Sequence, residues 1–293
     1  MFWIPITIGA AGFQVARNAL QRGLMGDAGP WGATLVRFLF GLPFTLLVLA
    51  PVAALSPGAH LNFSLTFWLA VSTGALSQLL ASAALLVAMR RAGFAIGTAL
   101  QQSSLPLSAV IGLAVFHDNL RPLAWLGVAV TTFGLAALTW PKGATGPQPL
   151  SGALFGLISG MCFGFSLNAF RHAELSLEPS RHILAAVTSV TVAQAMQSAA
   201  LTLVLAWRRP QALRSVIASW RQSLGAGLCG AIASLGWFTA IAFSPAGPVR
   251  AAGMVEMPMA AIAGRRFFKE RLTVWQLAAA AATAVGVALA ALG

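Results

Sequence analysis

Acidic residues are scarce in this sequence. Its 293 residues include six Asp and Glu against 18 Lys and Arg, and charged residues make up only 8% of the chain. Because a soluble domain carries about 25% charged residues, this composition excludes an ordinary soluble protein. The chain has only two cysteines, Cys162 and Cys229, both in apolar segments. Two isolated cysteines provide neither a disulfide framework nor the ligand spacing of a metal site.

Motifs of nucleic-acid binding and of catalysis are also missing. The net charge of +12 comes without a run of basic residues interleaved with aromatic ones, so we do not expect nucleic acid as a partner. The sequence has no phosphate-binding glycine loop, no HExxH motif and no Ser/His/Asp set, which argues against an enzyme. Its four histidines fall in expected loops or at helix ends. We therefore expect no metal or other cofactor, apart from a transported proton.

Long apolar runs make up most of the sequence. Hydrophobic residues make up 58% of the chain, and a helix of about 20 apolar residues spans the bilayer core. Polar or Pro/Gly-rich breaks then predict ten transmembrane helices in an all-α integral membrane protein. They are expected at residues 3–22, 31–55, 64–89, 94–116, 122–140, 151–171, 182–206, 219–242, 247–267 and 273–292.

An internal repeat divides the chain into two halves. The segment from residue 105 matches the segment from residue 257 at a constant shift, which superposes Pro106 on Pro258 and Gly134 on Gly286. The Pro/Gly-rich stretch 141–150 is the expected linker between residues 1–140 and 151–293. Because five helices is an odd number, two copies of one fold must enter the membrane from opposite sides. The sequence thus predicts two inverted five-helix repeats, an architecture typical of secondary transporters.

The tract RFLFGLPF from Arg37, together with the repeated proline helix, acidic corner and glycine helix, resembles the drug/metabolite transporter superfamily. The similarity is to its ten-helix EamA-type members. It implies a multi-pass carrier in the inner (plasma) membrane that exports a small metabolite, such as an amino acid, without ATP. A sugar-phosphate or other anionic-metabolite exchanger of the same superfamily is the alternative, and a channel is a further one. Paired prolines in inverted repeats favour alternating access over a channel.

Loop charges give the orientation of the chain. The loops on the side opposite the N-terminus hold twelve Lys and Arg, which indicates that this side is cytoplasmic. The side of the N-terminus holds four, namely Arg121, Arg171, Arg181 and Arg250. The resemblance implies the opposite orientation, with both termini inside. The alternatives stay open at this point.

Glu256 is the leading candidate for function. It lies within an apolar tract, whereas the other acids, Asp27, Asp118, Glu174, Glu178 and Glu270, are expected in loops or at helix ends. An ionisable group inside the membrane is costly and normally faces a partner or a water-filled path. Glu256 could bind a transported proton, balance a substrate amine, or pair with a buried arginine. It replaces Ser104 at the position related by the repeat.

Further polar residues could line a substrate cavity with Glu256. Gln14, Arg17 and Asn18 share a face of the first helix with Gln21. Snorkelling to the headgroups is the alternative for Arg17 and Arg171. The remaining candidates are Gln78, Gln101, Ser104, Asn168, Arg171 and the cavity-wall residue Trp237, with helix breaks at Pro106 and Pro258.

Small residues indicate helix packing. Gly152, Gly156, Gly160 and Gly164 recur every fourth residue on one helix face, and close packing is the favoured interpretation over a sliding surface. Two glutamines, Gln194 and Gln197, are expected to hydrogen-bond to neighbouring helices. The alanine-rich last helix is compatible with a homodimer. The expected partners are thus a small-molecule substrate, the lipid bilayer and a second copy.

Overall fold

The computed structural model describes residues 2–104, 122–139, 149–244, 246–270 and 272–292. Within these residues the chain is helical, with turns and short connections but no strand. In the described part of the chain, five helical segments are long and apolar enough to cross a membrane: Ala28–Ala54, Leu65–Ala92, Leu150–Leu177, His182–Arg208 and Trp220–Phe243. The protein is therefore all-helical and of the membrane type, as the composition predicts.

The chain forms two compact units that do not coincide with its two sequence halves. Unit 1 comprises Met1–Leu79 and Ser166–Val249, and unit 2 comprises Leu80–Phe165 and Arg250–Gly293. Each unit thus takes one segment from each half. Two long helices, α4 (Leu65–Ala92) and α8 (Pro149–Leu177), contribute to both units.

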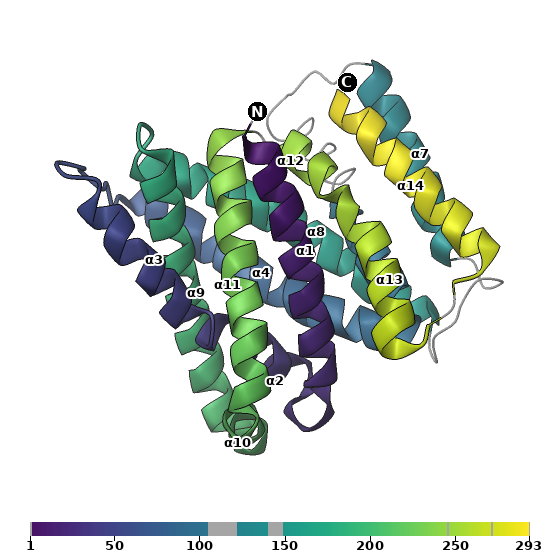
Figure 1. Cartoon of the computed structure of the whole chain (residues 1–293), viewed down its shortest axis with the longest axis horizontal. Helices are drawn as coiled ribbons and strands as arrows, with labels where there is room; N and C mark the ends of the chain where they lie inside the picture. Colours follow the sequence, from purple (N-terminus) through teal and green to yellow (C-terminus); the bar gives the residue numbers. More distant parts are fainter. Residues whose placement is uncertain (1, 105–121, 140–148, 245, 271, 293) are drawn as a thin grey trace. The chain divides into compact units, whose positions relative to one another are not determined.

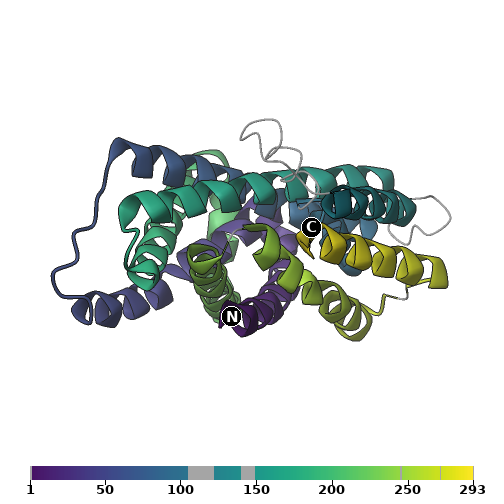
Figure 2. The ribbon, with the colours of Figure 1, turned by 90° about the horizontal axis from the view of Figure 1, so that it is seen from above.

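Unit 1 is built around α1 and α11, which pack along each other (Figures 1 and 2). Its helices are α1 (Trp3–Gly23), α2 (Met25–Leu39), α3 (Leu42–Ala54), α9 (His182–Arg208), α10 (Pro210–Ala218) and α11 (Trp220–Phe243), with the start of α12 (Ala246–Ala252). The core of this unit includes Leu35, Phe38, Leu205 and Val216. The segment of α10 was predicted to be a loop, but it forms a short surface helix. Its apolar side, with Ala212 and Val216, packs on α2, and its charged side stays exposed.

One predicted helix is divided in two. The segment 31–55 forms α2 and α3, which are separated at Phe40 and Gly41. The interruption brings Gly41 against α11, where an added Cβ would lie 3.2 Å from the carbonyl oxygen of Gly227. The same Cβ would collide with the carbonyl oxygen of Arg37, so glycine suits this position after the end of α2.

Unit 2 contains the pair α7 (Pro122–Thr139) and α14 (Val274–Leu292), which lie side by side (Figure 2). It also contains α5 (Phe94–Gln101), the 3₁₀ turn η2 (Gly253–Val255) and α13 (Glu256–Phe268). The contact between α7 and α14 is reciprocal. An added Cβ at Gly134 would lie 2.7 Å from the backbone nitrogen of Thr283, and one at Gly286 would collide with the backbone nitrogen of Thr131.

Most predicted helices agree with the structure to within a few residues at each end. The main difference at the C-terminal side is that the segment 247–267 is interrupted by η2, so α12 and α13 are separate helices. The expected helix 94–116 can be compared only up to residue 104, and Pro106 lies outside the described residues, as does most of the linker 141–150.

Candidate functional site

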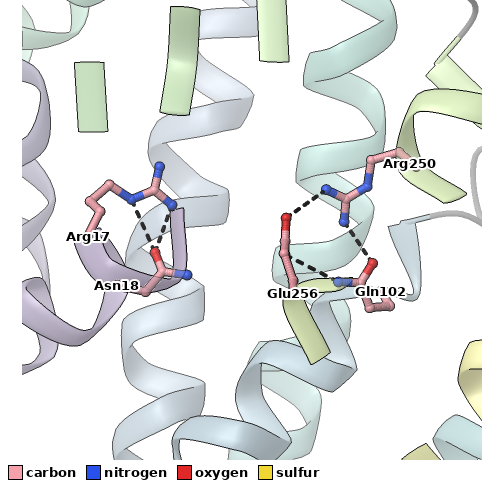
Figure 3. Close-up of polar contacts among 5 residues, drawn as sticks. All are labelled: Arg17, Asn18, Gln102, Arg250 and Glu256. Carbon is pink, nitrogen blue, oxygen red and sulfur yellow. Dashed lines mark hydrogen bonds and ion pairs between the residues drawn. The ribbon is translucent and has the colours of Figure 1, made fainter. Parts of the chain in front are cut away.

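Glu256 is buried at the start of α13 and belongs to a cluster of three polar side chains in unit 2. Its exposed fraction is 0%, and that of Arg250 is 4%. Arg250 Nη1 lies 3.8 Å from Glu256 Oε1, and Gln102 Nε2 donates a hydrogen bond of 3.3 Å to Glu256 Oε2. Arg250 Nη2 in turn donates to Gln102 Oε1 at 3.1 Å. The three side chains point toward one another in Figure 3.

The break between α12 and α13 explains why the sequence did not reveal this pairing. On a continuous α-helix, residues six apart differ by about 240° around the axis and do not share a face. Here η2 lies between Arg250 and Glu256 and interrupts the α-helical spacing. Arg250 was counted from the sequence among the cations on the side of the N-terminus, near the start of the expected helix 247–267, whereas the structure buries it beside Glu256. Gln102 was not among the candidate site residues from the sequence, although its neighbour Gln101 was.

The glycine face of α8 holds the end of α5 in place within unit 2. An added Cβ at Gly156 would lie 2.6 Å from Leu100 Cβ, and one at Gly160 would lie 2.8 Å from the carbonyl oxygen of Gln101. At Gly164 the same test gives 2.8 Å to the carbonyl oxygen of Ser104. The packing interpretation of these glycines is confirmed. Their close approach positions the segment that carries Gln102.

Several polar side chains beside Gln102 are buried without a hydrogen-bond partner among the described residues. Gln101, Ser103 and Ser104 are buried, and their side-chain oxygen and nitrogen atoms make no hydrogen bond within the described part of the chain. Each such group costs about 1–3 kcal/mol unless water or a ligand satisfies it. This segment therefore supplies hydrogen-bonding capacity next to the ion pair of Arg250 and Glu256.

The polar stripe of α1 is buried within unit 1. Gln14, Arg17, Asn18 and Gln21 are all buried. Arg17 donates from Nε and Nη2 to Asn18 Oδ1, at 3.1 and 2.7 Å (Figure 3). Because only 1% of Arg17 is exposed, snorkelling does not describe it.

A second buried arginine lies near Arg17. Arg37, at the end of α2, is 2% exposed. An added Cβ at Gly230 would lie 3.2 Å from Arg17 Cδ and 3.4 Å from Arg37 Cβ, so the two side chains pack around the same glycine of α11. Unit 1 thus contains two buried arginines that pack on Gly230, of which only Arg17 was a candidate from the sequence.

The other candidates of unit 1 make contacts between helices. Gln197 Nε2 donates to Gln78 Oε1 at 2.9 Å, and Thr45 Oγ1 lies 3.1 Å from Gln194 Oε1, so the expected bonding of these glutamines to neighbouring helices is confirmed. Arg171 donates from Nη1 to the carbonyl oxygens of Ile241 and Ser244, where α11 ends. Asn168 is half-buried, and Trp237 is buried.

Glu174 does not lie where the sequence analysis expected it. It was grouped with acids in loops or at helix ends, but it is 1% exposed and lies in α8, one turn after Arg171. Neither carboxylate oxygen has a hydrogen-bond partner among the described residues. The expected end of this helix at residue 171 was too early, since α8 continues to Leu177.

Comparisons with known proteins agree with this architecture. Residues 150–292 match the sequence profile of the EamA-like transporter family. A solved structure, described only as the crystal structure of a protein, is similar over 97% of this chain and 98% of its own, with a TM-score of 0.58 and 18% identity. At that identity the similarity concerns the fold alone. No curated protein sequence matches the chain.

Proposed function

We propose that the protein is a secondary active transporter working by alternating access, because residues 150–292 match the sequence profile of the EamA-like transporter family. Its substrate is a small amphipathic metabolite, an amino acid or a related compound, which it exports across the inner membrane. The observation that carries this proposal is the buried cluster of Glu256, Arg250 and Gln102. A carboxylate within an apolar helix of such a protein is expected to serve transport.

The geometry of the cluster suits a carboxylate that changes partners. Charge-assisted hydrogen bonds to carboxylates are about 2.7–2.9 Å long, whereas Glu256 lies 3.8 Å from Arg250 Nη1 and 3.3 Å from Gln102 Nε2. A carboxylate offers about four acceptor positions. Glu256 can therefore take up a proton or a substrate ammonium group in exchange for its contact with Arg250.

Reciprocal packing of α7 and α14 supports the inverted repeat that alternating access requires. The two contacts, Gly134 with Thr283 and Gly286 with Thr131, exchange under the same constant shift that relates the two halves. A pseudo-twofold axis between equivalent helices produces such pairs of equivalent contacts. The repeats would then bring their proline helices to the same membrane depth, where carriers of this type hold substrate.

A second candidate function rests on Arg17 and Arg37. Two buried arginines that pack on the same glycine suit a phosphate or carboxylate, so an exchanger of anionic metabolites is the alternative. Arg171 was the other arginine named as a candidate from the sequence. Arg37 is the better second member, because Arg171 binds the carbonyl groups that end α11.

The test is transport by purified protein in liposomes. Vesicles loaded with unlabelled amino acids are assayed for counterflow of labelled amino acids, and separately for uptake driven by an imposed pH gradient. Glu256→Gln is compared with Glu178→Gln, which alters an acid in the connection after α8, where Ser180 donates to the carboxylate. The control should transport like the wild type.

Each outcome has a distinct meaning. If Glu256 carries the proton, Glu256→Gln should lower the rate of gradient-driven uptake at least tenfold and leave the rate of counterflow unchanged. If Glu256 binds the substrate amine, both activities fall. Unchanged activity in both assays would overturn the role of the cluster, and flux without any counterflow would indicate a channel. Exchange of a phosphorylated metabolite that is lost in Arg37→Gln would favour the second candidate.

A further inference from the structure

A groove runs between α5, α13 and α14 in unit 2, and its two hollows share the lining residues Ala261, Leu272 and Leu277. The outer hollow, of about 890 Å³, lies where α13 ends and α14 begins, and its lining includes Lys269, Glu270 and Leu272; both helices are labelled in Figure 1. The inner hollow, of about 310 Å³, continues along α14 as far as Ala284. From Leu277 to Ala284 the groove follows α14 for about 10 Å, at roughly 1.5 Å per residue.

The outer hollow is cationic. Arg265 and Lys269 line it and are both exposed. Lys269 has a left-handed backbone, with φ of 54°, and ends α13, while the next backbone N–H, that of Glu270, bonds to the carbonyl oxygen of Gly264 at 3.0 Å. A lysine in this conformation is uncommon and somewhat strained. The tight turn keeps Lys269 beside the groove.

Glu270 also lines the outer hollow, but its carboxylate already accepts hydrogen bonds from the backbone of α5. The carboxylate of Glu270 accepts hydrogen bonds from the backbone N–H of Phe94, at 2.9 and 2.8 Å, and from that of Ala95 at 3.4 Å. These groups form the N-terminus of α5, the positive end of the helix dipole. The two cations therefore dominate the field at the mouth of the groove.

The inner hollow is apolar except for one amide. Its lining is mostly alanine and aliphatic residues, with Met257 and Pro258 at one side. Gln276 also lines it and is 0% exposed. Its Oε1 accepts a hydrogen bond from the backbone of Thr273, but its Nε2 has no partner within the described residues. A buried donor of this kind favours a ligand that brings an acceptor into an otherwise apolar groove.

We propose that this groove binds an anionic glycerophospholipid. The phosphate contacts Arg265 and Lys269, an ester carbonyl accepts a hydrogen bond from Gln276, and one acyl chain follows α14 toward Ala284. The groove presents cations at its mouth, then one hydrogen-bond donor, then an apolar lining. This order matches the phosphate, ester and acyl chain of such a lipid. A soluble anion would satisfy the cations but not the apolar part, whose edge residues Ile262 and Leu277 are well exposed. The proposal is independent of what the protein transports.

Native mass spectrometry of the detergent-purified protein tests the proposal. The protein is titrated with phosphatidylglycerol or phosphatidylcholine that carries the same acyl chains, and the bound fraction is measured. We expect preferential binding of phosphatidylglycerol, weakened about thirtyfold in Arg265→Ala/Lys269→Ala, because each cation near an anionic headgroup contributes roughly a factor of five. The control Arg214→Ala/Arg221→Ala removes two exposed arginines from unit 1.

Further variants separate the lipid from other occupants. Ala284→Phe narrows the inner hollow and leaves all charges intact, so it should also weaken binding of phosphatidylglycerol. Gln276→Leu should weaken it less than loss of the two cations does. Equal loss in both charge-removal variants, or equal affinity for the two lipids, would overturn the proposal. So would displacement of the lipid by glycerol 3-phosphate at equal concentration, which would indicate a site for soluble anions.

Discussion

Removal of Arg250 should leave the charge of Glu256 buried without its ionic partner. At the observed separation of 3.8 Å, two unit charges attract each other by about 4 kcal/mol if the effective dielectric constant is roughly 20. Loss of one member of a buried pair costs about 3–5 kcal/mol. We therefore expect Arg250→Ala to lower the free energy of unfolding by about 3–4 kcal/mol. The bond from Arg250 to Gln102 is lost at the same time.

A double-mutant cycle separates the ion pair from the lost packing. In Arg250→Ala/Glu256→Gln no charge remains in the cluster, so the double variant should be less destabilised than the sum of the single variants by about 2–3 kcal/mol. The assay is reversible unfolding in mixed micelles, with the SDS mole fraction as the denaturant. Arg214→Ala, an exposed arginine in α10, is the control and should change stability by no more than about 0.5 kcal/mol.

One result of the cycle would refute this reasoning. If the effects of the two single variants add to within about 0.5 kcal/mol, Arg250 and Glu256 are not coupled in the folded protein. The contacts of the cluster would then contribute no measurable coupling free energy to the stability of the protein. Its assignment as a partner-exchanging site would fail with it.

Two further predictions concern packing and capping in unit 2. Gly160→Ala should destabilise the protein by about 1–3 kcal/mol and lower transport, because the added Cβ would lie 2.8 Å from the carbonyl oxygen of Gln101; Gly9→Ala, with nothing within 4 Å, is the matched control in the same unfolding assay. Glu270→Ala removes the acceptor at the N-terminus of α5 and should cost about 1–2 kcal/mol. Hydrogen exchange at the first turn of α5 should then increase, and unchanged exchange would contradict the capping role.

The sequence predicted features that follow from the pattern of residues along a single helix. Gly156, Gly160 and Gly164 lie at a spacing that only a helix face explains, and the structure packs each of them against the segment 100–104. The apolar runs likewise predicted most helices, because the bilayer thickness sets their length. The polar stripe of α1 was visible from its helical spacing, since a polar face on an apolar helix avoids lipid, and its residues are buried in unit 1.

The partners of the site could not be read in the same way. Gln102 and Arg250 are far apart in sequence, and their meeting at Glu256 depends on how α5 packs near α13. Hydrophobic periodicity describes which face of one helix is buried but not which helix covers it. Arg37 was visible in the sequence as part of a motif, yet its position beside Arg17 depends on Gly230 of a distant helix.

Burial of Arg250 also changes the argument about orientation. Charge counting assumes that the basic residues lie in loops, where they affect insertion. Arg250 is buried beside Glu256, and Arg171 binds the carbonyl groups at the end of α11. Neither is a freely solvated loop charge, so the side of the N-terminus loses two of its four cations while the opposite side keeps twelve. The bias toward a cytoplasmic location of the loop between α13 and α14 becomes stronger. That location would face the lipid groove toward the leaflet where anionic headgroups attract basic segments, so the corrected charge count and the proposed lipid site support each other.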